Sequence, residues 1–175
     1  MNILKKTLHT ACASALALSA LHAGAVRADG TIVLTDGEGA VVCSIPAGLP
    51  AGQVRHMYNL KETSGCKQNK AKGFALSSVP SATLITFISY DGCVRAKNKG
   101  EYYFTIKTTK QPTHWGEKIF MRFADLAAIQ KGKSIGDGKT ARLEDEFVGA
   151  DLKGKEWGEL LSCVEVEPSP PANKP

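Results

Sequence analysis

Short runs of β-branched and aromatic residues recur along the chain from residue 31 onward, separated by Gly, Pro and Asp. Residues 31–45 contain two such runs around Asp36-Gly37-Glu38-Gly39, which predicts a hairpin. Residues 83–90 are apolar on both faces and predict a central, buried strand. Residues 101–108 alternate, which predicts a strand with one solvated face, carrying Thr105 and Lys107.

The remaining segments complete a β pattern. Further strands are expected at 54–60, 74–78, 118–124 and 157–166, while 142–148 fits either a strand or a helix. A single helical turn is expected from Asp125 to Gln130, with Asp125 as its N-cap. About nine strands at this short spacing predict an all-β fold, a Greek-key β-sandwich.

The first 28 residues have the three-part layout of a secretory signal peptide. Lys5 and Lys6 precede an uncharged run from Thr7 to Ala23, and small residues suited to cleavage follow, up to Ala28. The apolar run is short and contains polar residues, so it is a poor membrane span. We therefore expect a periplasmic or secreted protein that keeps no membrane span after cleavage.

Cleavage removes most of the excess positive charge. The whole chain has a net charge of +5, whereas the mature chain keeps 19 Lys+Arg against 17 Asp+Glu, a net charge of +2. A nucleic-acid partner is therefore not expected.

Four cysteines remain after cleavage: Cys43, Cys66, Cys93 and Cys163. Their spacings of 23, 27 and 70 residues contain no CxxC, so neither a redox pair nor a zinc site is indicated. An exported chain favours two structural disulfides, and the sequence alone allows all three pairings.

The mature chain is expected to form one domain over residues 29–166. Four prolines among the last eight residues predict a disordered tail, which we place at 167–175.

The middle of the chain resembles the βγ-crystallin Greek-key motif. The resemblance rests on Tyr58-Asn59-Leu60, on Gly65–Leu76 and on Thr83–Gly92. It implies a crystallin-like motif over 31–95 and a divergent second half over 96–166. Within this motif we expect the disulfide Cys66–Cys93, which leaves Cys43–Cys163 to join the ends.

Many microbial βγ-crystallins bind Ca²⁺ through a polar loop, whose matching positions here are Gln68, Asn69, Lys72 and Gly73. This loop has no carboxylate and carries several lysines, which oppose a cation. We therefore expect no metal site and no cofactor.

The sequence also speaks against an enzyme. Only His56 and His114 remain after cleavage, and the chain has no HExxH. Its GxSxG match, residues 132–136, lies in a Gly-rich loop without the strand-then-helix frame of a nucleophile elbow. The carboxylates of Glu144-Asp145-Glu146 are interpreted as an acidic surface loop. No catalytic residues are assigned.

Rigid, disulfide-braced β scaffolds suit protein binding, and some secreted proteins of the crystallin fold are peptidase inhibitors or toxins. We expect a non-enzymatic protein that binds a protein partner, such as a secreted hydrolase or toxin, as an inhibitor or immunity-type factor. The expected contact residues are His114, Trp115, Lys67, Lys70 and Lys72. Trp115 is either an exposed anchor or ordinary packing. The alternatives are a structural or stress-protective envelope protein with residual calcium binding, and a small secreted toxin or hydrolase.

Overall fold

The computed structural model describes residues 30–49, 52–116, 118–152, 157 and 160–168. The predicted leader at 1–28 and most of the predicted tail lie outside these residues. Within the described part, the backbone forms ten strands, one α-helical turn and two 3₁₀ turns. In chain order these are β1 (Thr31–Thr35), β2 (Val41–Pro46), β3 (His56–Asn59), β4 (Gly73–Ser77), β5 (Leu84–Ile88), β6 (Tyr102–Thr108), β7 (Met121–Arg122), α1 (Phe123–Leu126), β8 (Ser134–Ile135), η1 (Asp137–Lys139), β9 (Ala141–Val148), η2 (Ala150–Leu152) and β10 (Cys163–Glu167).

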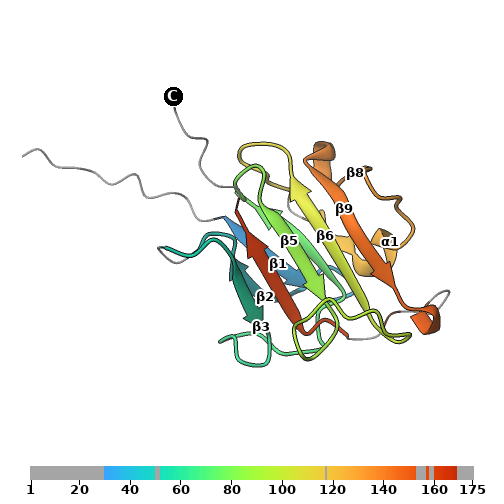
Figure 1. Ribbon diagram of the computed structural model, residues 1–175. Coiled ribbons are helices and arrows are strands. Elements are labelled where there is room, and N and C mark those ends of the chain that lie inside the picture. Colours follow the sequence, from blue (N-terminus) through green and yellow to red (C-terminus); the bar gives the residue numbers. More distant parts are fainter. Residues whose placement is uncertain (1–29, 50–51, 117, 153–156, 158–159, 169–175) are drawn as a thin grey trace, which may run out of the picture.

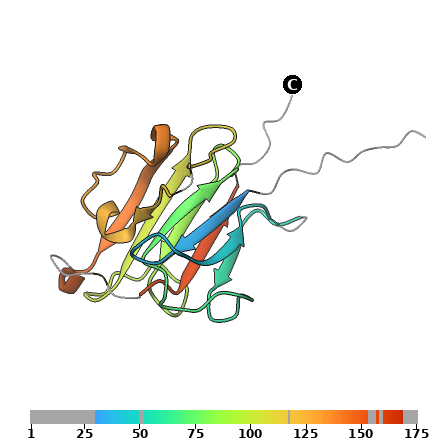
Figure 2. The same cartoon turned by 180° about the vertical axis from the view of Figure 1, so that it is seen from behind.

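The strands form two sheets in which every pairing is antiparallel. Sheet A has the order β2-β1-β4-β7, and sheet B has the order β3-β10-β5-β6-β9-β8. The two sheets lie in two layers, so that β1 is behind β10 and β5 in Figure 1 and in front of them in Figure 2. The predicted all-β class is therefore confirmed, and the 31–45 hairpin is present as β1 and β2.

Each sheet takes a strand from the opposite part of the chain. The strand β3 lies between β2 and β4 in sequence, yet it pairs with β10 in sheet B. Conversely, β7 follows β6 in sequence but pairs with β4 in sheet A. This exchange ties the N-terminal and C-terminal parts into one sandwich.

The core lies between the two sheets. Ile32 and Leu34 of β1 are fully buried, as is Phe74 of β4, whose ring centroid lies 4.3 Å from that of Phe87 in β5. Because alternate strand residues point to opposite faces, Val33 lies on the outer face of sheet A. Each buried large apolar side chain stabilises the fold by about 1.5–3 kcal/mol.

The outer face of sheet B is less solvated than the sequence predicts. Tyr103 and Thr105, on the face of β6 expected to be open to water, are each only 5% exposed. Tyr103 joins Ile88 and Cys163 in a second apolar cluster. The hydroxyl groups of Thr105 and Thr86 share a hydrogen bond. Arg95, in the segment after β5, donates to the same Thr86 hydroxyl, so the arginine lies over this part of the sheet.

The disulfides are Cys43–Cys66 and Cys93–Cys163, so the expected pairing is wrong. The reason is topological. The strand β10 pairs directly with β5, with Cys163 opposite Ile88, and Cys93 follows soon after β5. Cys163 therefore lies close to Cys93, with a Cα–Cα distance of 5.4 Å. The expected pairing instead joined Cys93 to Cys66, because both lie within the motif at 31–95 and Cys163 does not.

Several boundaries also differ from the predictions. Asp125 is not an N-cap, because α1 begins at Phe123 and Arg122 is its N-cap, without a side-chain cap bond. The last strand begins at Cys163 rather than 157 and includes Glu167, which was assigned to the tail.

Two ambiguous segments are also resolved. Residues 142–148 form a strand, within β9, since they pair with β6. The expected strand at 118–124 is reduced to the two residues of β7.

Candidate partner-binding groove

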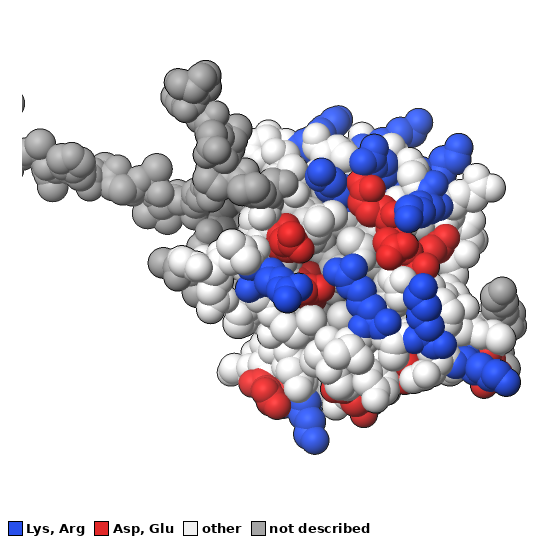
Figure 3. Space-filling model, viewed as in Figure 1, with Lys and Arg blue, Asp and Glu red and all other residues white. Residues whose placement is uncertain are grey.

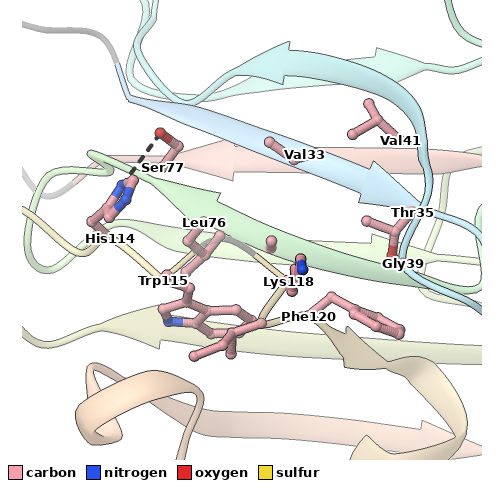
Figure 4. A pocket seen from close by; sticks show the side chains of 13 residues that line it. Val33, Thr35, Gly39, Val41, Leu76, Ser77, His114, Trp115, Lys118 and Phe120 are labelled. Atoms are coloured by element: carbon pink, nitrogen blue, oxygen red, sulfur yellow. Dashed lines mark hydrogen bonds between the residues drawn. The ribbon is translucent and has the colours of Figure 1, made fainter.

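An apolar groove of about 280 Å³ lies on the outer face of sheet A. Its floor includes Val33 of β1 and Ala75 of β4, which are cross-strand partners. Val41, at the start of β2, stands at the rim and is 67% exposed. The opposite wall is formed by residues 114–116 and 118–120, shortly before β7. We call this hollow the Trp115 groove; Figure 4 shows Val33, Trp115 and Phe120 around it.

The segment that forms the wall is held to β4 by backbone bonds. Thr113 and Val79 exchange two hydrogen bonds, of 2.7 and 2.9 Å, and the Trp115 amide donates to the Leu76 carbonyl at 2.8 Å. The start of the wall is therefore fixed to the backbone of β4 and of the segment that follows it.

Trp115 itself is packed, not an exposed anchor. It is 3% exposed, its ring centroid lies 5.3 Å from that of Phe74, and its Nε1 donates to Thr140 Oγ1 at 2.9 Å. A fixed indole with its polar atom satisfied presents only apolar surface to the groove. Of the two interpretations left open for Trp115, packing is the one that the structure has.

His114 stands at the edge of the groove. It is exposed, and its Nδ1 lies 3.4 Å from Ser77 Oγ, the contact drawn in Figure 4. The imidazole is thus a polar rim group beside an apolar floor, the arrangement expected of a recognition surface.

The other end of the groove closes on Thr35 and Gly39. Phe120 packs so tightly on Gly39 that a Cβ there would lie 2.6 Å from its ring. Thr35 is 2% exposed, and among the described residues its hydroxyl has no hydrogen-bond partner. A buried hydroxyl of this kind is uncommon and costs stability.

Of the three lysines predicted to contact a partner, only Lys72 lies near this groove. The Lys72 amide donates to the Thr35 carbonyl at 2.8 Å, which places Lys72 beside the closed end. Lys67 and Lys70 are exposed on the loop after β3 and are not among the described residues that line the groove. Lys118, not singled out by the sequence, lines it instead.

Sequence reasoning also missed the apolar lining: Val33, Val41, Ile119 and Phe120. One signal was present, because Ile32 and Leu34 face the core and Val33 therefore places an apolar side chain on the outward face. Ile119 and Phe120 lie in the segment 118–124, for which the sequence predicts a strand, and nothing in that pattern marked them as groove lining.

The polar loop of the crystallin resemblance forms a closed hydrogen-bonded cluster. Ser162 Oγ donates to Asp91 Oδ1 at 2.7 Å, and the Gln68 amide nitrogen donates both to that carboxylate and to Ser162 Oγ. The carboxylate missing from the loop is thus supplied by the turn after β5, where it meets an amide donor. In the described residues, no group of three or more His, Cys, Asp and Glu side chains has a metal-binding arrangement.

The histidines and the acidic run do not converge. His56 bonds Gln53 on the sheet B side, whereas His114 borders the groove of sheet A. Asp145 is engaged by Tyr103 and by Lys131. Burial, and then the neighbouring Asp145, raise the pKa of Glu146.

Comparison with known proteins gives no relative of this chain. No family model matches it, and neither a curated protein nor a solved structure does so. Among the described residues, no helix has the length and apolar character needed to cross a membrane.

Proposed function

We propose that this is an exported, non-catalytic protein-binding protein, of the inhibitor or immunity type, that receives an apolar side chain of its partner in the Trp115 groove. The observation that carries this proposal is an apolar hollow formed by strands and a fixed indole, with Val41 and Ile119 exposed at 67% and 41% on its rim.

The energetic argument is simple. Burying one large apolar side chain contributes about 1.5–3 kcal/mol, and a preformed pocket loses little of that to ordering. Protein interfaces typically centre on such an anchor with polar groups around it. His114 and Lys118 supply the polar surroundings here, and the exposed Lys72 lies beside the closed end of the groove. The cationic side chains favour acidic residues next to the anchor.

Export is supported by the two disulfides, since such bonds persist in oxidising compartments. A crystallin-like, double Greek-key arrangement is supported by the exchange of β3 and β7 between the sheets. Both properties suit a rigid scaffold that works outside the cytoplasm.

A second candidate, a structural or stress-protective envelope protein with residual calcium binding, is favoured by Asp91, whose carboxylate reaches the polar loop. Thermal melting with and without millimolar Ca²⁺ tests it. A rise in Tm that Asp91→Asn abolishes supports this candidate, and an unchanged Tm removes its calcium component.

The test of the main proposal is affinity capture from the envelope and secreted fractions of the source organism. Val41→Asp places a charge at the groove rim, and Val54→Asp is the matched control at a position 79% exposed outside the groove. We expect Val41→Asp to lose a stoichiometric partner that the control retains. Equal retention by both variants contradicts the proposal.

A further inference from the structure

A second groove lies on the opposite face of the sandwich, over sheet B. It has a volume of about 740 Å³ and lies between the start of β3 and the segment after β5, with Arg55, Met57, Val94 and Arg95 in its lining. We call it the Arg55–Arg95 groove. The disulfide Cys93–Cys163 links the segment after β5 to β10.

One buried carboxylate lies between the two arginines. Glu165 is 8% exposed on β10, and its two oxygens lie 3.5 Å from Arg55 Nη1 and 3.0 Å from Arg95 Nη2. Arg95 Nη2 also donates to Thr86 Oγ1, and Thr86 is the cross-strand partner of Glu165. Glu165 therefore fixes both guanidinium groups above the sheet.

The cluster keeps a net positive charge because two arginines face one glutamate. Each guanidinium has five N–H donors in a fork that matches an oxyanion, and the contacts above engage one terminal nitrogen of each. The two arginine side chains are 68% and 44% exposed. Glu165 on the sheet thus orients both guanidinium groups, whose other nitrogens face the groove.

The lining beside these charges is partly apolar and partly polar, since Gln53 and His56 also belong to it. Met57 and Ile88 contribute to its apolar part, and Val94 is 55% exposed next to Arg95. Figure 3 shows that basic and acidic side chains are interspersed across this face, so the groove is not part of a broad basic surface. A local pair of cations beside apolar surface selects an anionic group attached to an apolar one, rather than a polyanion.

We propose that the Arg55–Arg95 groove binds a carboxylate carried by an apolar group, with the carboxylate on the two guanidinium groups and the apolar part against Val94 and Met57. This site is separate from the Trp115 groove and does not depend on it.

Titration calorimetry with two probes tests the proposal and distinguishes the two possible sources of the carboxylate, a protein C-terminus and an acyl ligand. One probe is a short acetylated peptide with a C-terminal leucine carboxylate, and the other is decanoate below its critical micelle concentration. We expect one of them to bind, and its amide or methyl ester to bind at least tenfold more weakly. A peptide preference assigns a protein C-terminus, and a decanoate preference assigns an acyl ligand.

Charge variants give the sharper test. Arg55→Gln and Arg95→Gln should each weaken binding about tenfold, since each removes a charge-assisted contact. Glu165→Gln should strengthen it several-fold, because it removes the carboxylate that competes for the same donors. Arg142→Gln, an arginine paired with Glu144 elsewhere on this sheet, is the matched control and should change nothing.

The triple variant Arg55→Gln, Arg95→Gln, Glu165→Gln avoids leaving Glu165 buried without a partner, and it should fold but not bind. The proposal is overturned if neither acid binds at millimolar concentration, or if neutral derivatives bind as well as the acids. It is also overturned if the arginine variants match Arg142→Gln. Val41→Asp should leave this binding intact, so failure at one groove is distinguishable from failure at the other.

Discussion

Gly136 lies against the indole of Trp115 so closely that a Cβ at position 136 would come within 2.2 Å of the ring carbon Cζ2. Gly136 also has a φ of 75°, in the left-handed region. The position of the indole wall, and with it the groove, therefore depends on the absence of a side chain at 136.

Gly136→Ala is expected to displace Trp115 and to lower the free energy of unfolding by about 2–4 kcal/mol, from the clash together with the backbone strain. Urea denaturation measures this loss. Gly132→Ala is the control, since Gly132 has a φ of 84° but nothing within 4 Å of the added Cβ, and it should cost only about 1 kcal/mol. Equal losses would show that the contact with Trp115 carries no energy.

Thr35→Val should stabilise the protein by about 1 kcal/mol. The substitution keeps the shape of the side chain and removes a buried hydroxyl that has no hydrogen-bond partner among the described residues. The control is Thr86→Val, which breaks a 3.0 Å bond to Thr105 and should destabilise. Thermal melting compares the two, and a destabilised Thr35→Val would mean that its hydroxyl is satisfied.

The two disulfides should contribute unequally to stability. Cys43–Cys66 closes a separation of 23 residues and Cys93–Cys163 one of 70. In the chain-entropy treatment these correspond to about 3 and about 4 kcal/mol. Double Cys→Ala variants compared by urea denaturation should show the larger loss for the second pair. Non-reducing peptide mapping that found Cys66–Cys93 would contradict the topology itself.

Glu146 should make the stability depend on pH. Because burial and Asp145 raise its folded pKa above 4.5, the folded chain holds this proton where the unfolded chain has lost it. Its contribution to stability is therefore greatest at low pH and falls as the pH rises through the folded pKa. Glu146→Gln should raise the Tm at pH 7 by at most a few degrees and leave it unchanged near pH 3. An equal change at both pH values would point to packing instead.

The strands were the most predictable part of the fold, because β1, β5 and β6 carry apolar and β-branched patterns that need no tertiary context. Disulfide pairing was not predictable, since Cys163 meets Cys93 only after β10 pairs with β5, a contact between distant segments. The same holds for Glu165, which the sequence did not mark. Arg95 comes to it from 70 residues away.

The candidate groove was half predictable. His114 and Trp115 stood out as an aromatic loop, but whether the indole was exposed depended on Gly136 and Thr140, which approach it from another part of the chain. Lys67 and Lys70 were grouped with them by charge alone, and charge does not report which loops share a face.

Site-specific photo-cross-linking tests the central claim most directly. A photoreactive residue at Ile119, on the groove rim, is compared with one at Val54, outside it, in extracts of the envelope and secreted fractions. We predict a single cross-linked protein at Ile119, none at Val54, and loss of the Ile119 product when Ala75→Phe fills the floor of the groove. The same product at both positions, or an Ile119 product that survives Ala75→Phe, would contradict partner binding in the Trp115 groove.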